Sequence, residues 1–393
     1  MLSWVIKKSK ALEILKLQKK DVVSSEILEQ TDDIKLPEIS ENEALIKIGS
    51  AGLNFNSVWS ARCYPVDPFT LVNGHVRRNK EDRKHIQDYF IPGSDACGKI
   101  VKIGKNNKFK EGDEVVVHCA VISDDDLKLN DPMLSKSQSV WGYETNFGSF
   151  AEYSIVRISQ LIQKPKNINI IESGSYMLTL GTAYRMIISE NGGKLKKGET
   201  CLIWGASGGL GVFAIQLVKY AGGIPICVVS SKEKKEYCKK FGAEHIICLE
   251  EFENTNFLDK DNNFNNKMWI EFSMKLKKLI GIEKVDMVFE HIGKETMALS
   301  FFLLRRGGRV VTCAATSGYL AKIDIRYVWM EMKKLIGSHF CNQNEASEAS
   351  KLIASGDIVH NPSTVLDFKD IPLGLDMISK RNSLGKISIK IGN

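Results

Sequence analysis

An apolar run, a glycine-rich turn and a second apolar run follow one another directly at 200–218. The first run predicts a buried strand ending at Trp204, and the second has apolar residues at helical spacing, at Leu210, Phe213 and Leu217. Glycines between a strand and a helix let the backbone turn sharply and bring a pyrophosphate onto the free N–H groups of the helix. The expected cofactor contacts in the turn are Gly205, Ser207, Gly208, Gly209, Leu210 and Gly211.

The spacing of these glycines departs from the plain G-x-G-x-x-G pattern. Taken alone, it fits either a dinucleotide-binding turn or a tight strand-to-helix turn that needs glycine only for packing. The strand before the turn and the helix after it favour dinucleotide binding.

From residue 171 onward, strands and helices alternate. Strands are expected at 200–204, 224–229, 245–248, 285–290, 308–313 and 335–340, and helices at 178–188, 205–221, 232–241, 268–279, 294–304 and 345–354. This alternation predicts an α/β fold with a doubly wound parallel sheet. An asparagine-rich segment at 254–266 interrupts it as a surface insertion, ordered or disordered, that need not disturb the sheet.

The first 160 residues have a different pattern, with short strands at 44–49, 91–104 and 112–119 and no long helical pattern before residue 170. A polar stretch at 64–89 is interpreted as an insertion, and the tail at 385–392 alternates like a strand that returns to this domain. A chain of 393 residues is too long for one ordinary core. We therefore predict a β-rich domain at 1–165 with 360–393, and a Rossmann domain at 166–359.

Composition excludes several functional classes. The net charge of +7 is small and spread along the chain, so no nucleic-acid partner is expected, although an anionic small ligand would be favoured. Nine cysteines without C-x-x-C pairs fit reduced thiols in the cytoplasm and argue against a four-cysteine zinc site. Lys7 and Lys8 follow the N-terminus before any long apolar segment, so neither a signal peptide nor a membrane partner is expected.

The end of the second expected strand indicates which nicotinamide cofactor binds. In the NAD form of this fold an acidic residue about 20 positions after the glycines holds the ribose 2′-hydroxyl. Here the strand ends at Ser230 and Ser231, followed by Lys232 and Lys234. Hydroxyl and ammonium groups suit a 2′-phosphate, which favours NADPH, with Ser231 and Lys234 as contacts. Two alternatives stay open: Glu233 could face the ribose, or the lysines could form a solvated helix face.

Several segments in order between residues 50 and 340 carry a family likeness. The chain resembles the medium-chain dehydrogenase/reductase superfamily and, within it, the crotonyl-CoA carboxylase/reductases. The segments that carry the likeness include Asn54-Phe55-Asn56, Gly93-Ser94-Asp95-Ala96 and Val288-Phe289-Glu290-His291. The glycine turn and Gly112-Asp113-Glu114 are shared across the superfamily. More particular to the carboxylase/reductase branch are Trp141-Gly142-Tyr143-Glu144-Thr145, Arg326-Tyr327-Val328-Trp329 and Gly337-Ser338-His339-Phe340.

The resemblance implies a chaperonin-10-like (GroES-like) β domain, a Rossmann domain, and a cleft that holds NADPH and an enoyl-CoA thioester. It also implies a homodimer or homotetramer. Asn54 and its neighbours stand where zinc-dependent relatives would place the first metal ligand, and His118 and Cys119 are adjacent with no evident third ligand. We therefore expect no metal and interpret His118 as a strand-end histidine.

The resemblance also implies that carbon dioxide is held by Asn54, Tyr143, Glu144 and His339. Amide and imidazole groups can polarise its oxygens, a glutamate can anchor a water or the histidine, and an aromatic ring excludes bulk water. Hydride addition to an enoyl-CoA gives an enolate, which yields a carboxylated acyl-CoA such as ethylmalonyl-CoA if it meets carbon dioxide before a proton. Tyr143 places a phenol where relatives can carry phenylalanine, and that favours protonation.

Further contacts follow from the same likeness. Arg326 and Tyr327 are expected either at the CoA phosphates or in a subunit contact, and Thr182, Ala314 and Ala315 beside the nicotinamide. The competing functions are a non-carboxylating enoyl-CoA or acryloyl-CoA reductase, a zinc-independent quinone oxidoreductase, and an NADPH-binding protein without enzymatic activity.

Overall fold

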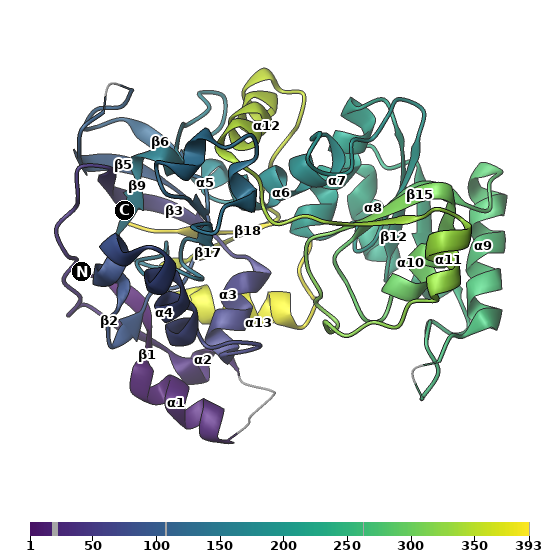
Figure 1. Cartoon of the computed structure of the whole chain (residues 1–393), viewed down its shortest axis with the longest axis horizontal. Coiled ribbons are helices and arrows are strands. Elements are labelled where there is room, and N and C mark those ends of the chain that lie inside the picture. Colours follow the sequence, from purple (N-terminus) through teal and green to yellow (C-terminus); the bar gives the residue numbers. More distant parts are fainter. Residues whose placement is uncertain (18–22, 107, 262, 393) are drawn as a thin grey trace. The chain divides into compact units, whose positions relative to one another are not determined.

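The computed structural model describes residues 1–17, 23–106, 108–261 and 263–392. The chain forms two compact units, which are treated separately below (Figure 1). The first unit comprises 1–178, 342–356 and 360–393, and the second comprises 179–341 and 357–359.

The second unit contains a six-stranded parallel sheet. Its strands, in spatial order, are β13 (His245–Cys248), β12 (Ile224–Val229), β11 (Thr200–Ile203), β14 (Val285–Glu290), β15 (Leu304–Thr312) and β16 (Lys334–Gly337). Numbered along the chain, this order is 3-2-1-4-5-6, the order of a dinucleotide-binding fold. The predicted doubly wound α/β fold is therefore confirmed.

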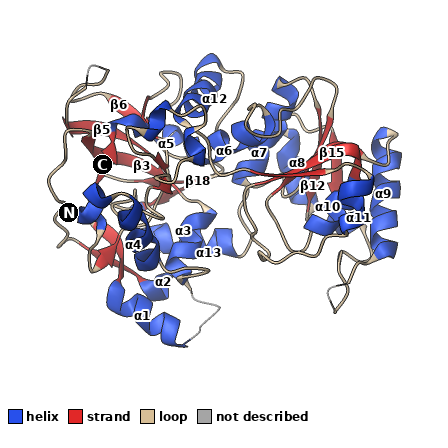
Figure 2. Ribbon diagram, viewed as in Figure 1, coloured by secondary structure: helices blue, strands red, loops and turns tan. Residues whose placement is uncertain are grey.

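Helices cover both faces of this sheet (Figure 2). They are α6 (Met177–Ile187), α7 (Gly209–Tyr220), α8 (Lys232–Lys239), α9 (Asn266–Ile280), α10 (Met297–Leu303) and α11 (Ile325–Met330). Because both faces are covered, the central strands need apolar side chains on both sides, and every residue of β11 is buried. The apolar runs give the limits of β12, β13 and β14 correctly for this reason, whereas β15 begins four residues earlier and β16 ends three residues earlier than expected.

The asparagine-rich segment before α9 is attached to the core of the second unit through aromatic residues, Phe257 and Phe264. Phe257 is buried and lies edge-on to Trp204, with ring centroids 5.4 Å apart. Its carbonyl oxygen accepts a hydrogen bond of 2.9 Å from Nε1 of Trp269. The segment thus lies against the domain and leaves the sheet undisturbed.

The first unit is built on a mainly antiparallel sheet. Its main path is β10 (Leu161–Gln163), β6 (Glu114–Val117), β5 (Ala96–Ile103), β3 (Glu43–Gly52), β18 (Ile387–Lys390) and β17 (Thr364–Asp367), and β9 (Tyr153–Arg157) also pairs with β3. Smaller sheets are formed by β1 (Ser3–Lys7), β2 (Leu28–Thr31) and β4 (Tyr89–Phe90), and by β7 (Ala120–Val121) with β8 (Ser139–Val140). The β-rich domain is therefore confirmed.

The tail strand joins this sheet as the alternation predicts. β18 pairs antiparallel with β3, with Ser388 opposite Gly52 and Lys390 opposite Ser50, and parallel with β17. Ile387 and Ile389 are buried in the same core as Ile46 of β3. Residues from the two ends of the chain thus form one hydrophobic core.

The expectation of no long helix before residue 170 is wrong. The first unit contains α1 (Lys8–Leu17), α2 (Ser24–Ile27), α3 (Phe55–Arg62), α4 (Pro68–Arg78) and α5 (Ile170–Ser173), and later α12 (Gln343–Ser355) and α13 (Ile371–Ser379). The polar stretch interpreted as an insertion holds α4. The carboxylate of Asp67 accepts hydrogen bonds from the N–H groups of Phe69 and Thr70, and Pro68 occupies the first turn. These are ordinary helix-start signals that the polar composition obscured.

Gly74 offers a simple test of helix α4. An added Cβ there would meet only the Nη1 atom of Arg78, at an ordinary contact distance of 3.5 Å. Glycine within a helix costs about 0.5–1 kcal/mol relative to alanine. We expect Gly74→Ala to raise the free energy of unfolding by about that amount, as measured by denaturant titration. A lower free energy of unfolding would contradict the assignment of this stretch as a regular helix.

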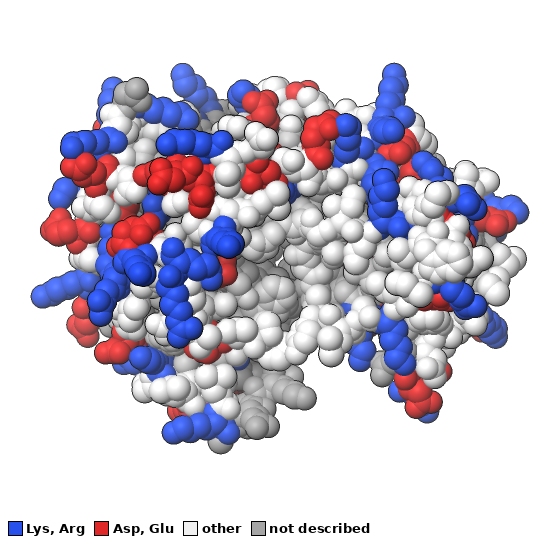
Figure 3. Space-filling model, viewed as in Figure 1, with Lys and Arg blue, Asp and Glu red and all other residues white. Residues whose placement is uncertain are grey.

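Surface properties agree with the sequence. Lysine and arginine alternate with aspartate and glutamate over the face seen in Figure 3, without a large field of one sign. All nine cysteines lie in the described part of the chain, and none of them forms a disulfide. Within the described ranges, no helix combines the length and the apolar character that crossing a membrane requires.

Candidate active site

The glycine turn of the second unit lies at the carboxyl end of β11. Gly205 has a φ of +57°, a left-handed conformation that favours glycine. A Cβ on Gly211 would lie 2.5 Å from the carbonyl oxygen of Gly205 and 2.6 Å from the backbone of Ala206. The tight turn therefore requires both glycines.

The turn leaves room beside the start of α7. Gly208 is the N-cap of this helix, and a Cβ added to it would meet only the oxygen of Gly205, at 3.4 Å. Gly208 has no side chain to cap the helix, so the first N–H groups of α7 suit an anion. Ser207 is buried in the turn, and Leu210 lies in the first helical turn. These features fit the pyrophosphate of a dinucleotide.

The loops after β14 and β15 lie beside this turn. Nε2 of His291 and the carbonyl oxygen of Trp204 are 2.9 Å apart, and the N–H of Thr316 donates to the oxygen of His291. Ala314 and Ala315 follow β15, and Ala315 lies against Gly293. Parallel strands end at one edge of a sheet, so these loops share an edge with the glycine turn.

Glu290, at the end of β14, fixes the loop that follows it through hydrogen bonds. The sequence did not lead us to expect this role. Its buried carboxylate accepts hydrogen bonds from the N–H groups of Ile292 and Gly293 and from the hydroxyls of Thr296 and Ser300. Burial raises its pKa, and these hydrogen bonds oppose the shift. The sequence signal was an acidic residue directly after the apolar run Met287-Val288-Phe289.

The expected 2′-phosphate contacts lie at the end of β12. The hydroxyl of Ser231 caps α8 by accepting from the N–H of Lys234 at 3.3 Å. The ammonium of Lys234 turns back and donates to the hydroxyl of Ser230 at 2.9 Å. Glu233 is exposed on the first turn of α8. A lysine and two serines thus gather at the strand end.

Two segments of the first unit with residues expected at the carbon dioxide site come together, namely Asn54 with the following helix α3, and the loop that carries Tyr143. The rings of Trp59, on α3, and Tyr143 have centroids 6.4 Å apart. The loop that carries Tyr143 is fixed by Asn146, which accepts from the N–H of Ile91 and donates to the oxygen of Tyr89. Gly142, at φ +66°, lies so close to Gly93 that no side chain would fit.

Asn54 stands immediately before α3 and is buried. Its Oδ1 accepts a hydrogen bond of 2.5 Å from the ammonium of Lys386. Its Nδ2 donates to Oδ2 of Asp95 at 3.3 Å and to the carbonyl oxygen of Gly52 at 3.4 Å. The side chain therefore serves as no helix cap and belongs to a buried polar network.

Tyr143 and Glu144 are both largely buried ionisable residues whose pKa values are raised. Burial and the neighbouring Glu144 raise the pKa of Tyr143 to about 12, so the phenol keeps its proton at neutral pH. Burial also raises the pKa of Glu144, against the charge of Arg78 and a backbone hydrogen bond. The Oε2 atom of Glu144 is buried and has no hydrogen-bond partner among the described residues. Such an oxygen is available to a ligand or a water.

His339 belongs to the second unit and follows β16. The N–H of Ser338 donates to the oxygen of Thr312, which places this segment beside the end of β15. The ring of His339 lies against Phe340, with centroids 4.4 Å apart, and the residue is exposed. Although part of the residue is exposed, the protein around the ring desolvates it, and this together with the charge of Arg185, on α6, lowers its pKa to about 4, so the imidazole is neutral at pH 7. Thr182 is buried on the same helix.

Comparisons with known proteins agree with this geometry. Residues 40–166 match the alcohol dehydrogenase GroES-like domain, and residues 209–355 match the zinc-binding dehydrogenase family. A crotonyl-CoA reductase of Streptomyces avermitilis is 39% identical over 360 residues, which cover 91% of this chain and 81% of the relative. A crotonyl-CoA carboxylase/reductase of Cereibacter sphaeroides is 40% identical over 87% of this chain and 79% of its own. The chain belongs to the crotonyl-CoA carboxylase/reductase family.

A solved structure extends the family match to the fold. A 2-octenoyl-CoA carboxylase reductase in complex with NADP and 2-octenoyl-CoA superposes with a TM-score of 0.93 at 35% identity. The match covers 99% of this chain and 87% of the other. The predicted carboxylase/reductase branch is therefore confirmed.

In the chain described here, Arg326 and Tyr327 lie on α11. The guanidinium of Arg326 is exposed and binds the carboxylate of Asp324, with its Nη2 2.7 Å from Oδ2. The ring of Tyr327 lies edge-on to Phe302, under the ammonium of Lys333. A phosphate at Arg326 would therefore compete with Asp324.

One group of possible metal ligands occurs among the residues that the structure describes, namely His75, Asp82 and His85 in the first unit. Oδ2 of Asp82 already contacts both Nε2 of His75 and the guanidinium of Arg157, each at 2.8 Å. A positive charge bound to the same oxygen disfavours a cation. We interpret the group as an ion-pair network, and His118 lies outside it, immediately after β6.

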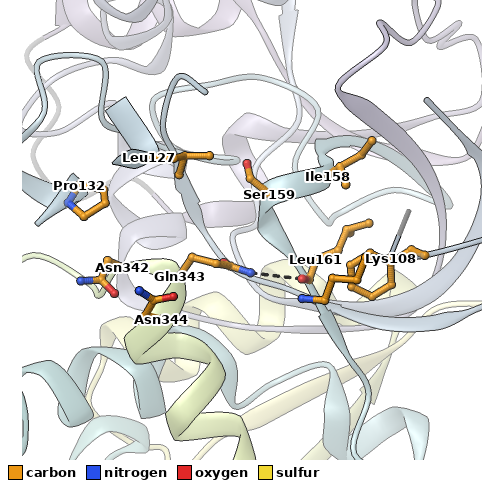
Figure 4. A pocket seen from close by; sticks show the side chains of 10 residues that line it. Lys108, Leu127, Pro132, Ile158, Ser159, Leu161, Asn342, Gln343 and Asn344 are labelled. Atoms are coloured by element: carbon orange, nitrogen blue, oxygen red, sulfur yellow. Dashed lines mark hydrogen bonds between the residues drawn. The ribbon is translucent and has the colours of Figure 1, made fainter. Parts of the chain in front are cut away.

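A pocket of about 340 Å³ also lies in the first unit (Figure 4). It combines the apolar side chains of Phe109 and Leu161 with the amides of Asn342, Gln343 and Asn344 at the start of α12. The amide of Gln343 donates to the oxygen of Leu161 at 3.2 Å. None of the residues predicted for catalysis or cofactor binding lines this pocket.

Proposed function

We propose that this carboxylase/reductase reduces an enoyl-CoA of the crotonyl-CoA type with NADPH and fixes carbon dioxide at the α-carbon. The product is ethylmalonyl-CoA or a related alkylmalonyl-CoA. The observation that carries the proposal is the match over 99% of the chain to a 2-octenoyl-CoA carboxylase reductase bound to NADP and 2-octenoyl-CoA. Identities of 39–41% to crotonyl-CoA reductases support it.

The second unit holds the cofactor in this proposal. The glycine turn and the N-terminus of α7 bind the pyrophosphate, Ser231 and Lys234 bind the 2′-phosphate, and Thr182, Ala314 and Ala315 border the nicotinamide. Bound NADPH supplies the hydride that adds to the β-carbon of the enoyl thioester. The electron pair of the double bond then moves toward the thioester carbonyl and gives an enolate.

The fate of this enolate depends on four residues that we propose as the carbon dioxide site. Asn54, Tyr143 and Glu144 come from the first unit, and His339 comes from the second. The amide and the neutral imidazole can donate to the oxygens of carbon dioxide, and the unpartnered oxygen of Glu144 can hold a water or accept from the imidazole. The rings of Tyr143 and Trp59 reduce the space for bulk water.

A reductase that does not carboxylate is the second candidate. The observation in its favour is the phenol of Tyr143, which keeps its proton at neutral pH and could deliver it to the enolate. An acryloyl-coenzyme A reductase of Sulfurisphaera tokodaii is 24% identical over 91% of this chain.

The two functions differ in the mass of the product. NADPH oxidation is followed with crotonyl-CoA, with and without bicarbonate, and the acyl-CoA product is analysed by mass spectrometry. A gain of one carbon dioxide over the saturated acyl-CoA supports carboxylation. Saturated acyl-CoA alone would leave only the reductase, and no turnover with any enoyl-CoA would exclude both.

Lys234 provides a test of cofactor choice. Its ammonium lies where a 2′-phosphate is expected, and NADH lacks that phosphate. We expect Lys234→Ala to weaken NADPH binding about tenfold, equal to about 1.4 kcal/mol, and to change NADH binding little. Fluorescence titration of both cofactors measures this. Lys232→Ala, an exposed lysine on the same helix, is the matched control.

An equal loss for both cofactors in Lys234→Ala would show that the lysine supports the fold of α8 and does not select the phosphate.

We further propose a homodimer or homotetramer. β16 is an edge strand of the parallel sheet, with one side of its backbone unpaired in that sheet. Large apolar side chains are exposed in and near it, at Leu335 (50% exposed), Trp329 (67%) and Met332 (56%). An exposed apolar edge strand suits pairing with a second copy of the chain. Light scattering of the purified protein determines the assembly.

The remaining proposals concern location and domain limits. We propose a cytoplasmic protein, supported by the nine cysteines outside disulfides. The functional division that we propose is a GroES-like domain at 1–165 with 360–393 and a cofactor domain at 166–359. The family matches at 40–166 and 209–355 support it. Arg326 and Tyr327 are proposed for the CoA phosphates or, alternatively, for the contact between subunits.

A further inference from the structure

A buried lysine in the first unit uses all its hydrogen-bonding capacity on the segment that carries Asn54 and on Asp95. Nζ of Lys386 donates to the carbonyl oxygen of Leu53 at 2.9 Å, to Oδ1 of Asn54 at 2.5 Å and to Oδ2 of Asp95 at 3.4 Å. Lys386 is 3% exposed and Asp95 is fully buried. An ammonium has three N–H donors, so this lysine keeps none for a substrate.

The two charged groups specify the orientation of the Asn54 amide. An ammonium only donates, so it must face the amide oxygen, and an ionised carboxylate only accepts, so it must face the amide nitrogen. The structure shows this arrangement, with Nδ2 of Asn54 3.3 Å from Oδ2 of Asp95. An Asn54 amide rotated by 180° would place its N–H groups against the ammonium of Lys386 and its oxygen against the carboxylate of Asp95. Lys386 and Asp95 therefore each disfavour the rotated amide.

Hydrogen bonds from backbone N–H groups hold both charged residues of the network. Lys386 directly precedes β18, and its carbonyl oxygen accepts from the N–H of Ser363 at 2.9 Å. Oδ1 of Asp95 accepts from the N–H of Leu178 at 3.3 Å. Burial lowers the pKa of Lys386 and raises that of Asp95, and the attraction between the two charges opposes both shifts.

The amide nitrogen of Asn54 is oriented by two long hydrogen bonds. It carries two hydrogens, and its two contacts, at 3.3 and 3.4 Å, are longer than the usual range of about 2.7–3.2 Å. Donation to an oxygen of carbon dioxide would replace the longer of the two, the contact with the carbonyl oxygen of Gly52.

We propose that Lys386 and Asp95 are positioning residues for carboxylation, which hold the amide of Asn54 in the orientation that donates to carbon dioxide. They thereby set the share of the enolate that is carboxylated and not protonated. This inference rests on the proposed function. It assigns a catalytic consequence to the tail strand, which brings Lys386 to the site.

The share of carboxylated product tests the proposal. Wild type, Lys386→Met and the exposed matched control Lys390→Met, on β18, are given crotonyl-CoA, NADPH and saturating bicarbonate. We expect Lys386→Met to lower the carboxylated share about tenfold while NADPH oxidation stays within about twofold, and Lys390→Met to behave as wild type. An unchanged share in Lys386→Met, or an equal loss of both products, would overturn the proposal.

Lys386→Met leaves the Asp95 carboxylate buried without its partner, which can destabilise the fold. The double variant Lys386→Met/Asp95→Asn buries no unpaired charge and is expected to show the same loss of carboxylation with a wild-type melting temperature. If neither variant folds, the pair has a structural role and the proposal is wrong. If wild type itself yields no carboxylated product, the proposed function is wrong. The wild-type reaction therefore separates failure of the proposed function from failure of the positioning role.

Discussion

Replacing Gly211 by alanine is expected to weaken NADPH binding by at least about a hundredfold, equal to about 2.7 kcal/mol. The new methyl group would lie 2.5 Å from the oxygen of Gly205 and 2.6 Å from the backbone of Ala206. Both neighbours are backbone atoms and cannot rotate away as a side chain would. The turn must open, and the N–H groups of α7 then lose the arrangement that suits a pyrophosphate. Fluorescence titration with NADPH measures the loss.

Thermal unfolding separates this effect from a general loss of structure. NADPH raises the melting temperature of a protein that binds it, and we expect Gly211→Ala to lose that increase. Gly74→Ala is the control, because its new methyl group has room. Near-normal NADPH affinity in Gly211→Ala would mean that the turn does not form the phosphate site.

The second large effect is expected at Asn54. Asn54→Ala removes the proposed amide donor to carbon dioxide, while the hydride donor and the enoyl-CoA site are unchanged. A hydrogen bond is worth about 0.5–1.5 kcal/mol, so we expect the carboxylated share of the product to fall by up to about tenfold. NADPH oxidation with crotonyl-CoA should continue, and saturated acyl-CoA should become the main product. Mass spectrometry of the products at saturating bicarbonate measures the ratio.

Asn73→Ala is the matched control for Asn54→Ala, because Asn73 is exposed on α4. Asn54→Ala also removes one acceptor from Lys386, so its melting temperature must be compared with that of wild type. A carboxylated share equal to that of wild type in a folded Asn54→Ala protein would exclude the amide from the carbon dioxide site.

The second unit was predictable from the sequence because its strands are buried on both faces. Such strands are continuous apolar runs, and 224–229, 245–248 and 285–290 have the predicted limits. The first unit was less predictable. Its α4 begins with a clear cap at Asp67 and Pro68 and its apolar side chains recur on one face, but they are few among polar and charged residues. These start signals were present in the sequence, but the polar composition led to the interpretation of this stretch as an insertion.

The site was predictable only where a local pattern fixes it. The glycine turn is one continuous segment, and its required glycines are where the sequence predicted them. Lys386 lies 332 positions from Asn54 in the chain, and no local pattern connects the two. Only the pairing of β18 with β3 brings them together. The buried acceptor role of Asp95 was likewise invisible, since a short Gly-Ser-Asp segment is typical of a turn.

The position of β18 has a consequence for synthesis of the protein on the ribosome. Its residues, 387–390, are translated more than 330 positions after β3, beside which they lie. The sheet of the first unit therefore cannot close until β18 has been synthesised and has left the exit tunnel. Residues 179–341 and 357–359 leave the exit tunnel earlier, so the second unit can finish folding while β3 still has an open flank. A nascent chain stalled before residue 387 is expected to have that flank exposed to chaperones.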